Sequence, residues 1–137
     1  TQKSMNLLSV VNPNDLCKQI LQLDRSIRFA GVANMKGKLV AQAYREGLIP
    51  LLTKQETELS ALQAIVKMAT RQSLEEKKLG KTIYAFAHYE KLKRATIPLI
   101  DDPRSDYVLL VSFDLNAEHE SIILHKILPL VRKDRTK

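Results

Sequence analysis

The sequence predicts a single α+β domain in which one five-stranded antiparallel sheet is sandwiched between helices. Two helical patterns alternate with strand-like runs, these runs follow each other closely enough to form hairpins, and a further helix follows the last strand. The order is therefore α-β-β-α-β-β-β-α, and 137 residues is an ordinary length for one domain. We expect the long middle helix to cover one face of the sheet and the other two helices the opposite face.

The first helix is predicted over residues 13–25. Asn12 is a good N-cap, and Pro13 occupies the first helical position, where its missing N–H costs nothing. Apolar residues then recur every three or four positions, which indicates one buried face: Leu16, Ile20, Leu23 and Ile27. Cys17 flanks this stripe, and we expect its thiol to act as a small buried hydrophobe.

A hairpin follows, with strands at 28–34 and 38–44. The short connection ends in Gly37, which can adopt the positive φ that such a turn requires. Residues 47–50 then form a loop that leads to the second helix.

The second helix is predicted from Thr53 to Gly80. Thr53 and Glu56 form a capping box at its start, and Gly80 is the expected stop. At 100° per residue, the predicted buried side consists of Leu59, Leu62, Ile65, Val66, Ala69 and Ser73. The predicted outward side carries the basic residues Lys67, Arg71 and Lys78.

Three further strands are predicted at 82–89, 92–100 and 107–113, with a turn at 101–105. The run 107–113 is apolar without alternation, which favours a central strand covered on both faces. Pro98 should lie near a strand end. A last helix should start near Asn116, and Pro129 should end or kink it. Its predicted buried face consists of Ile122, Ile123, Ile127 and Leu128.

The folded domain is expected to span 13–131, between a flexible segment at 1–12 and a basic, frayed tail at 132–137. Apolar runs are too short for a membrane span, and nothing at the N-terminus reads as a signal peptide, so we expect neither. A single cysteine fits a reducing, cytoplasmic setting. The net charge of +7 is compatible with nucleic acid, anionic lipid or an acidic protein as a partner, and does not choose among them.

No pattern in the sequence indicates a catalytic site, a cofactor site or a metal site. His119 and His125 are six residues apart and point about 120° away from one another on a helix, so they do not form a ligand pair. Asp101, Asp102 and Asp106 lack the further oxygen ligands of a calcium loop. Gly31 and Gly37 do not have phosphate-loop spacing. We therefore expect no enzymatic activity.

The stretch Phe29-Ala-Gly-Val-Ala-Asn-Met-Lys-Gly-Lys-Leu-Val-Ala41, in the element order above, resembles roadblock/LC7 domains and the wider profilin-like folds. Ile27 to Val32, Arg45 to Gly47, Pro50 to Leu52 and Tyr89 to Lys91 resemble a family of uncharacterised archaeal single-domain proteins. The likeness spans roughly 13–130 and rests on structural motifs.

This resemblance implies a homodimer joined edge to edge, with the long helices side by side, that binds or regulates small GTPases. The run 82–89 has few of the charges that normally protect an exposed strand edge. The expected pairing residues are Thr82, Tyr84, Phe86 and His88, and the expected partner-facing residues of the helix are Lys67, Arg71 and Lys78.

Two other functions remain open at this point. A small-molecule sensor of PAS-like or profilin-like plan would need an apolar cavity between the sheet and the long helix, with a few convergent polar groups. A nucleic-acid binder would use the basic residues as one face, ideally with exposed aromatics. The basic residues cluster at the first hairpin, at the second hairpin and in the tail, but aromatic residues make up only 5% of the chain.

Overall fold

The computed structural model describes residues 12–99 and 107–132. The expected flexible segment up to residue 11, the acidic turn at 101–105, and the tail beyond Arg132 lie outside these residues.

One five-stranded antiparallel sheet organises the chain, as predicted. Its strands are β1 (Ile27–Asn34), β2 (Leu39–Tyr44), β3 (Ala85–His88), β4 (Lys93–Leu99) and β5 (Tyr107–Phe113), in the spatial order β2-β1-β5-β4-β3. The unalternating β5 is the central strand, and Pro98 is the penultimate residue of β4, which also confirms the predictions for these residues.

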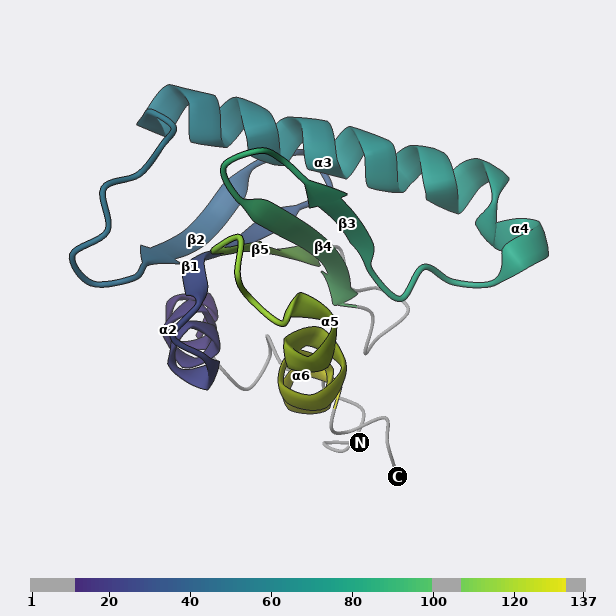
Figure 1. Cartoon of the computed structure of the whole chain (residues 1–137). Helices are drawn as coiled ribbons and strands as arrows, with labels where there is room; N and C mark the ends of the chain where they lie inside the picture. Colours follow the sequence, from purple (N-terminus) through teal and green to yellow (C-terminus); the bar gives the residue numbers. More distant parts are fainter. Residues whose placement is uncertain (1–11, 100–106, 133–137) are drawn as a thin grey trace.

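Helices cover both faces of the sheet (Figure 1). One face carries α3 (Lys54–Leu74), continued by the short α4 (Glu76–Leu79). The opposite face carries α2 (Pro13–Leu23) and a C-terminal helix made of α5 (His119–Ile122), the π-helical segment η2 (Ile123–Ile127) and α6 (Leu128–Val131). The predicted sandwich is therefore correct.

The main core lies between the sheet and the face that carries α2 and the C-terminal helix. Side chains from all these elements are fully or almost fully buried in it, among them Leu16, Ile20, Ile27, Val32, Ile97, Leu109, Phe113, Ile123 and Ile127. Burial of so many large apolar groups supplies most of the driving force for folding. Cys17 is part of this core, where burial raises the pKa of its thiol to about 11. The thiol is therefore protonated at neutral pH and packs as an apolar group.

A smaller core holds α3 on the other face. It consists of Ala33, Ala61, Ile65, Met68 and Val108. The predicted buried side of this helix is largely wrong, because Leu59 is 61% exposed and Val66 is 56% exposed. The helix carries two apolar stripes, and periodicity does not reveal which of the two meets the sheet. The sheet selects the stripe with Ala61, whose small side chain allows close approach, and the leucine stripe faces outward.

The ends of the long helix follow the predicted signals. The capping box is present, with Thr53 N–H donating to Glu56 Oε1 over 2.9 Å and Glu56 N–H donating to Thr53 Oγ1 over 3.1 Å. Gly80 terminates α4 with a φ of +91°. The predicted helix is thus interrupted once, at Glu75, between α3 and α4.

The C-terminal helix differs from the prediction in its start and its winding. Its N-cap is Glu118 rather than Asn116, and Val131 is buried where Leu128 is only partly buried. Pro129 does not end the helix: it is the second residue of α6, and the π-helical segment η2 ends two residues before it, at Ile127. A proline ring collides with the carbonyl four residues earlier in an α-helix, and the wider π-turn relieves this collision.

Arg132 also differs from the prediction, which placed it in a frayed tail. Its guanidinium donates to the carbonyl of Pro98 over 2.9 Å and to that of Ile83 over 3.4 Å. These bonds tie the end of the C-terminal helix to β4 and to the segment before β3.

Candidate functional site

The strand β3 forms one edge of the sheet, so one side of its backbone has no neighbouring strand in the described chain. It is shorter than predicted, at four residues. Phe86 and His88 lie in it and are exposed, whereas Thr82 and Tyr84 precede it. Tyr84 packs against the main core, and Thr82 N–H donates to a carboxylate oxygen of Glu76 in α4 over 3.0 Å. The N–H of Thr82 is therefore bonded to α4, and the β3–β4 ladder begins at Ala85.

Behind this edge, two side chains join β3 to the C-terminal helix. The Phe86 and His119 rings are stacked, with centroids 3.9 Å apart. Lys93 is only 8% exposed, and its ammonium donates to the carbonyl of Ala117 over 2.9 Å and lies 3.2 Å from His119 Nδ1. Burial, and secondly the charge of Lys93, lower the pKa of His119. The imidazole is therefore neutral at pH 7, with Nδ1 as an acceptor. Sequence patterns did not reveal the contact between Lys93 and His119, because these residues are 26 positions apart in the chain.

The basic residues of the long helix lie on the side of α3 that faces β4 and β3. Ser60 Oγ accepts a hydrogen bond from Arg94 of β4, so the side of α3 that carries Ser60 faces β4. Lys67 and Arg71 follow Ser60 by about two and three helical turns, so they lie on the same side of the helix as Ser60. Lys78 lies in α4. Lys67 and Lys78 are exposed and Arg71 is half-buried, and none of the three forms an ion pair within the described residues.

The opposite flank of α3 is apolar and exposed. Leu62 covers the turn between β1 and β2 at Gly37, and Leu59 and Val66 lie on the same stripe. The loop before α3 adds further exposed apolar side chains, namely Ile49, Leu51 and Leu52. Large apolar side chains gathered on one part of a surface are typical of an interaction site.

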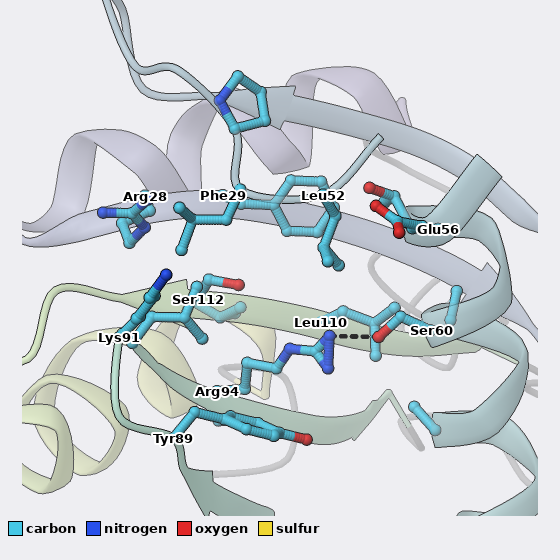
Figure 2. A pocket seen from close by; sticks show the side chains of 18 of the residues that line it. Arg28, Phe29, Leu52, Glu56, Ser60, Tyr89, Lys91, Arg94, Leu110 and Ser112 are labelled. Atoms are coloured by element: carbon cyan, nitrogen blue, oxygen red, sulfur yellow. Dashed lines mark hydrogen bonds between the residues drawn. The ribbon is translucent and has the colours of Figure 1, made fainter. Parts of the chain in front are cut away.

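A cavity of about 830 Å³ lies between the N-terminal half of α3 and the sheet (Figure 2). Its floor is one row of the sheet, because Phe29 of β1 pairs with Ser112 of β5, which pairs in turn with Arg94 of β4. Its roof is α3, and the turn between β3 and β4 closes one side.

Small side chains on both walls explain why the cavity is not filled. On the sheet these are Ser112 and Thr96, and on α3 they are Ser60, Ala61 and Ala64. Leu52, Phe29 and Leu110 make much of the remaining surface apolar. The cavity is the feature that a small-molecule sensor requires, and the sequence pattern alone did not reveal it.

Three cationic side chains line this cavity: Arg28, Lys91 and Arg94. Arg94 lies over the ring of Tyr89, 5.3 Å from its centroid, and like Lys91 it forms no ion pair within the described residues. Two carboxylates also line the cavity, Glu56 and Glu90. Glu56 is held in the capping box, and Figure 2 shows it at the end away from Arg28 and Lys91.

At the end of the sheet, Asp114 joins β1 and β2 to the start of the C-terminal segment. It accepts from Arg45 Nη1 over 2.8 Å and Nη2 over 3.2 Å, and from Arg28 Nη1 over 3.2 Å. These bonds, led by the one from Arg45, lower the pKa of Asp114. Two basic residues of the first hairpin, Arg28 and Arg45, therefore have a structural role as partners of Asp114.

Within the described residues, no three His, Cys, Asp or Glu side chains are grouped so that they could hold a metal ion. In the same part of the chain, no helix has the length and apolar character needed to cross a membrane.

The sheet order and the two helical layers give the chain the fold of a Roadblock/LC7 domain. It matches a Roadblock/LC7 domain from Streptomyces avermitilis with a TM-score of 0.67 over 90% of this chain and 94% of that one, at 13% identity. The gliding protein MglB from Thermus thermophilus matches with a TM-score of 0.68 at 15% identity, over 91% of this chain and 90% of that one. MglB from Myxococcus xanthus matches with a TM-score of 0.66 at 16% identity, over 92% and 93%.

No model of a known protein family matches the sequence, and neither does any curated protein. At these identities the structural likeness establishes the fold alone.

Proposed function

We propose that this protein is a non-enzymatic, roadblock-like interaction module that pairs with a second copy through the edge strand β3. The observation that carries the proposal is the edge strand itself. Residues 85–88 contain no lysine, proline or acidic residue, and Phe86 is 37% exposed there. An unpaired, uncharged strand edge readily adds a strand from another chain.

The comparisons support pairing. One structural match is described as MglB with a tetrameric arrangement; its TM-score is 0.68 at 14% identity, over 90% of each chain. Edge-to-edge pairing of two copies would join their sheets and bring their α3 helices close to one another. The buried, reduced Cys17 agrees with the cytoplasmic setting expected for such a module.

We further propose that the paired module binds an acidic surface of a partner, with a small GTPase as the partner class that the fold resemblance implies. Lys67 and Arg71 support this, because both lie on the β3 side of α3 and neither has a carboxylate partner within the described residues. Unpaired surface cations accelerate association with an acidic partner and make it sensitive to salt.

The pairing is tested by sedimentation of the full chain at micromolar concentration. We expect twice the chain mass of 15.6 kDa for the parent protein, and a monomer for Phe86→Lys and His88→Lys. Val40→Lys is the matched control, since Val40 is 39% exposed on β2, which forms the opposite edge. A monomeric parent, or equal dissociation by Val40→Lys, would contradict the proposal. Circular dichroism establishes that each variant is folded.

The partner class is tested by titrating small GTPases of the source organism, loaded with GDP or with a non-hydrolysable GTP analogue. We expect Lys67→Glu combined with Arg71→Glu to weaken binding, and Lys18→Glu, on the opposite face of the sheet, to leave it unchanged. Tight, salt-sensitive binding of single-stranded DNA or RNA with no GTPase binding would instead favour a nucleic-acid binder.

A further inference from the structure

We propose that the cavity between α3 and the sheet binds a small amphipathic anion, with one negatively charged head group on an apolar body. This site is distinct from the pairing edge and goes beyond the proposed interaction function. Its volume of about 830 Å³ lies in the range of small-molecule sites.

The shape of the cavity is built into the fold. It exists because small residues face each other across the gap between α3 and the sheet, Ser60 and Ala64 on the helix and Ser112 below. A helix that served only to complete a core would carry larger side chains here. Close packing resumes further along α3, where Ile65 and Met68 are buried against the sheet.

Charge selects the kind of ligand. Arg28 and Lys91 lie at one end of the cavity, and Arg94 lies between them and Ser60 (Figure 2). Arg28 is already paired with Asp114, but Lys91 and Arg94 have no carboxylate partner among the described residues. Two such cations beside a partly enclosed, partly apolar space favour an anion over a neutral ligand or a cation.

The apolar lining selects the body of the ligand. Phe29, Leu52 and Leu110 lie around the middle of the cavity, next to the cationic end (Figure 2). A free inorganic anion would leave these side chains in contact with water and would gain nothing from them. A ligand with an apolar body attached to the head group removes this apolar surface from water.

Two of the three cations, Arg94 and Arg28, are held in place before a ligand arrives, which lowers the entropic cost of binding. The guanidinium of Arg94 is fixed by the hydroxyl of Ser60 on one side and by the ring of Tyr89 beneath it. Arg28 is fixed by Asp114. Lys91, in the exposed turn between β3 and β4, can adjust its position to the head group.

Two fluorescent probes of nearly the same shape test the proposal on the full chain. One is 1-anilinonaphthalene-8-sulfonate, and the other is N-phenyl-1-naphthylamine, which has the same ring system without the sulfonate. We expect the anionic probe to bind about tenfold more tightly, because each charge-assisted hydrogen bond contributes at that scale. Arg94→Gln and Lys91→Gln should each weaken the anionic probe several-fold and leave the neutral probe unchanged.

Lys67→Gln and Ala64→Leu complete the design. Lys67→Gln removes the same charge from the same surface outside the cavity and should change neither affinity. Ala64→Leu should fill the cavity and weaken both probes, with the helix intact by circular dichroism. Octanoate, octyl phosphate and inorganic phosphate then serve as competitors. Displacement by the first or second identifies the head group, whereas displacement by inorganic phosphate alone would overturn the requirement for an apolar body.

Three results would overturn the proposal outright. The first is equal affinity for the two probes in the parent protein. The second is an equal effect of Lys67→Gln and Arg94→Gln, which would show general attraction to a basic surface. The third is a probe affinity that falls as the protein dimerises, which would show that a second copy fills the cavity.

Discussion

The ammonium of Lys93 lies 3.2 Å from Nδ1 of His119, and this contact connects the second hairpin to the C-terminal helix at the edge of the sheet. The ammonium only donates hydrogen bonds, and a protonated imidazole has no acceptor nitrogen to offer it. The imidazole of His119 therefore stabilises the fold through this contact only while it is neutral.

This relationship predicts a pH-dependent stability. The pKa of His119 is lowered in the folded state, so the unfolded chain binds the extra proton first as the pH falls below its ordinary value of 6.5. Stability is therefore complete above that pH and is lost progressively below it. The charged groups around the ring are Lys93 and His88, which disfavour protonation, and Glu118 and Glu120, which favour it.

Urea unfolding between pH 7.5 and 5.5 measures this effect. The parent protein should lose stability over this range, and His119→Gln, which keeps an acceptor but does not titrate, should lose less. The control is His125→Gln, since His125 is exposed in η2. If His119→Gln shows the full pH dependence of the parent, the ring does not act through Lys93.

Asp114→Asn should destabilise the protein by about 1–2 kcal/mol, because it breaks a partly buried, charge-assisted pairing with two arginines. The lowered pKa of Asp114 means that this stabilisation is present above the ordinary value of 3.8 and is lost as the pH falls through the lowered one. Lys126→Gln is the control. It removes an exposed pair with Asp24 at 3.3 Å and should cost well under about 1 kcal/mol.

Gly37→Ala should cost more than Gly47→Ala, although both glycines have a positive φ, of +88° and +79°. Each substitution places a Cβ on a residue with left-handed backbone geometry, which destabilises the fold by about 1–2 kcal/mol. A Cβ at Gly37 also collides with Leu62 of α3, whereas a Cβ at Gly47 meets nothing within 4 Å. A double-mutant cycle with Leu62→Ala should show favourable coupling at Gly37. No coupling would mean that the helix does not rest on this turn.

Ile65→Ala and Val66→Ala test which stripe of α3 faces the sheet. Ile65 is 3% exposed, so its truncation should leave a cavity that costs about 2–4 kcal/mol. Val66 is 56% exposed, so the same change at the next residue should alter the free energy of unfolding by no more than about 0.5 kcal/mol. Similar losses for the two variants would refute the orientation of the helix.

The sequence predicted those features of the site that depend on local signals. The apolar character of 82–89 was visible as a strand without protective charges, and the resemblance to roadblock/LC7 domains placed this run at the pairing edge. It could not show that the strand would begin only at Ala85, since the backbone before it is engaged by distant residues: Glu76 accepts from the N–H of Thr82, and Arg132 donates to the carbonyl of Ile83. Nor could it show the cavity, which arises only where Ser60 and Ala64 of the helix meet Ser112 of β5.

Local chemistry thus determined by itself the element order, the capping box at Thr53, the stop at Gly80 and the central position of β5. Each of these follows from residues close together in the chain or from an unbroken apolar run. Tertiary structure decided which stripe of α3 is buried, how Pro129 is accommodated, and which cations gather around the cavity. These features depend on shape and charge matching between segments distant in sequence, and periodicity contains no information about such matching.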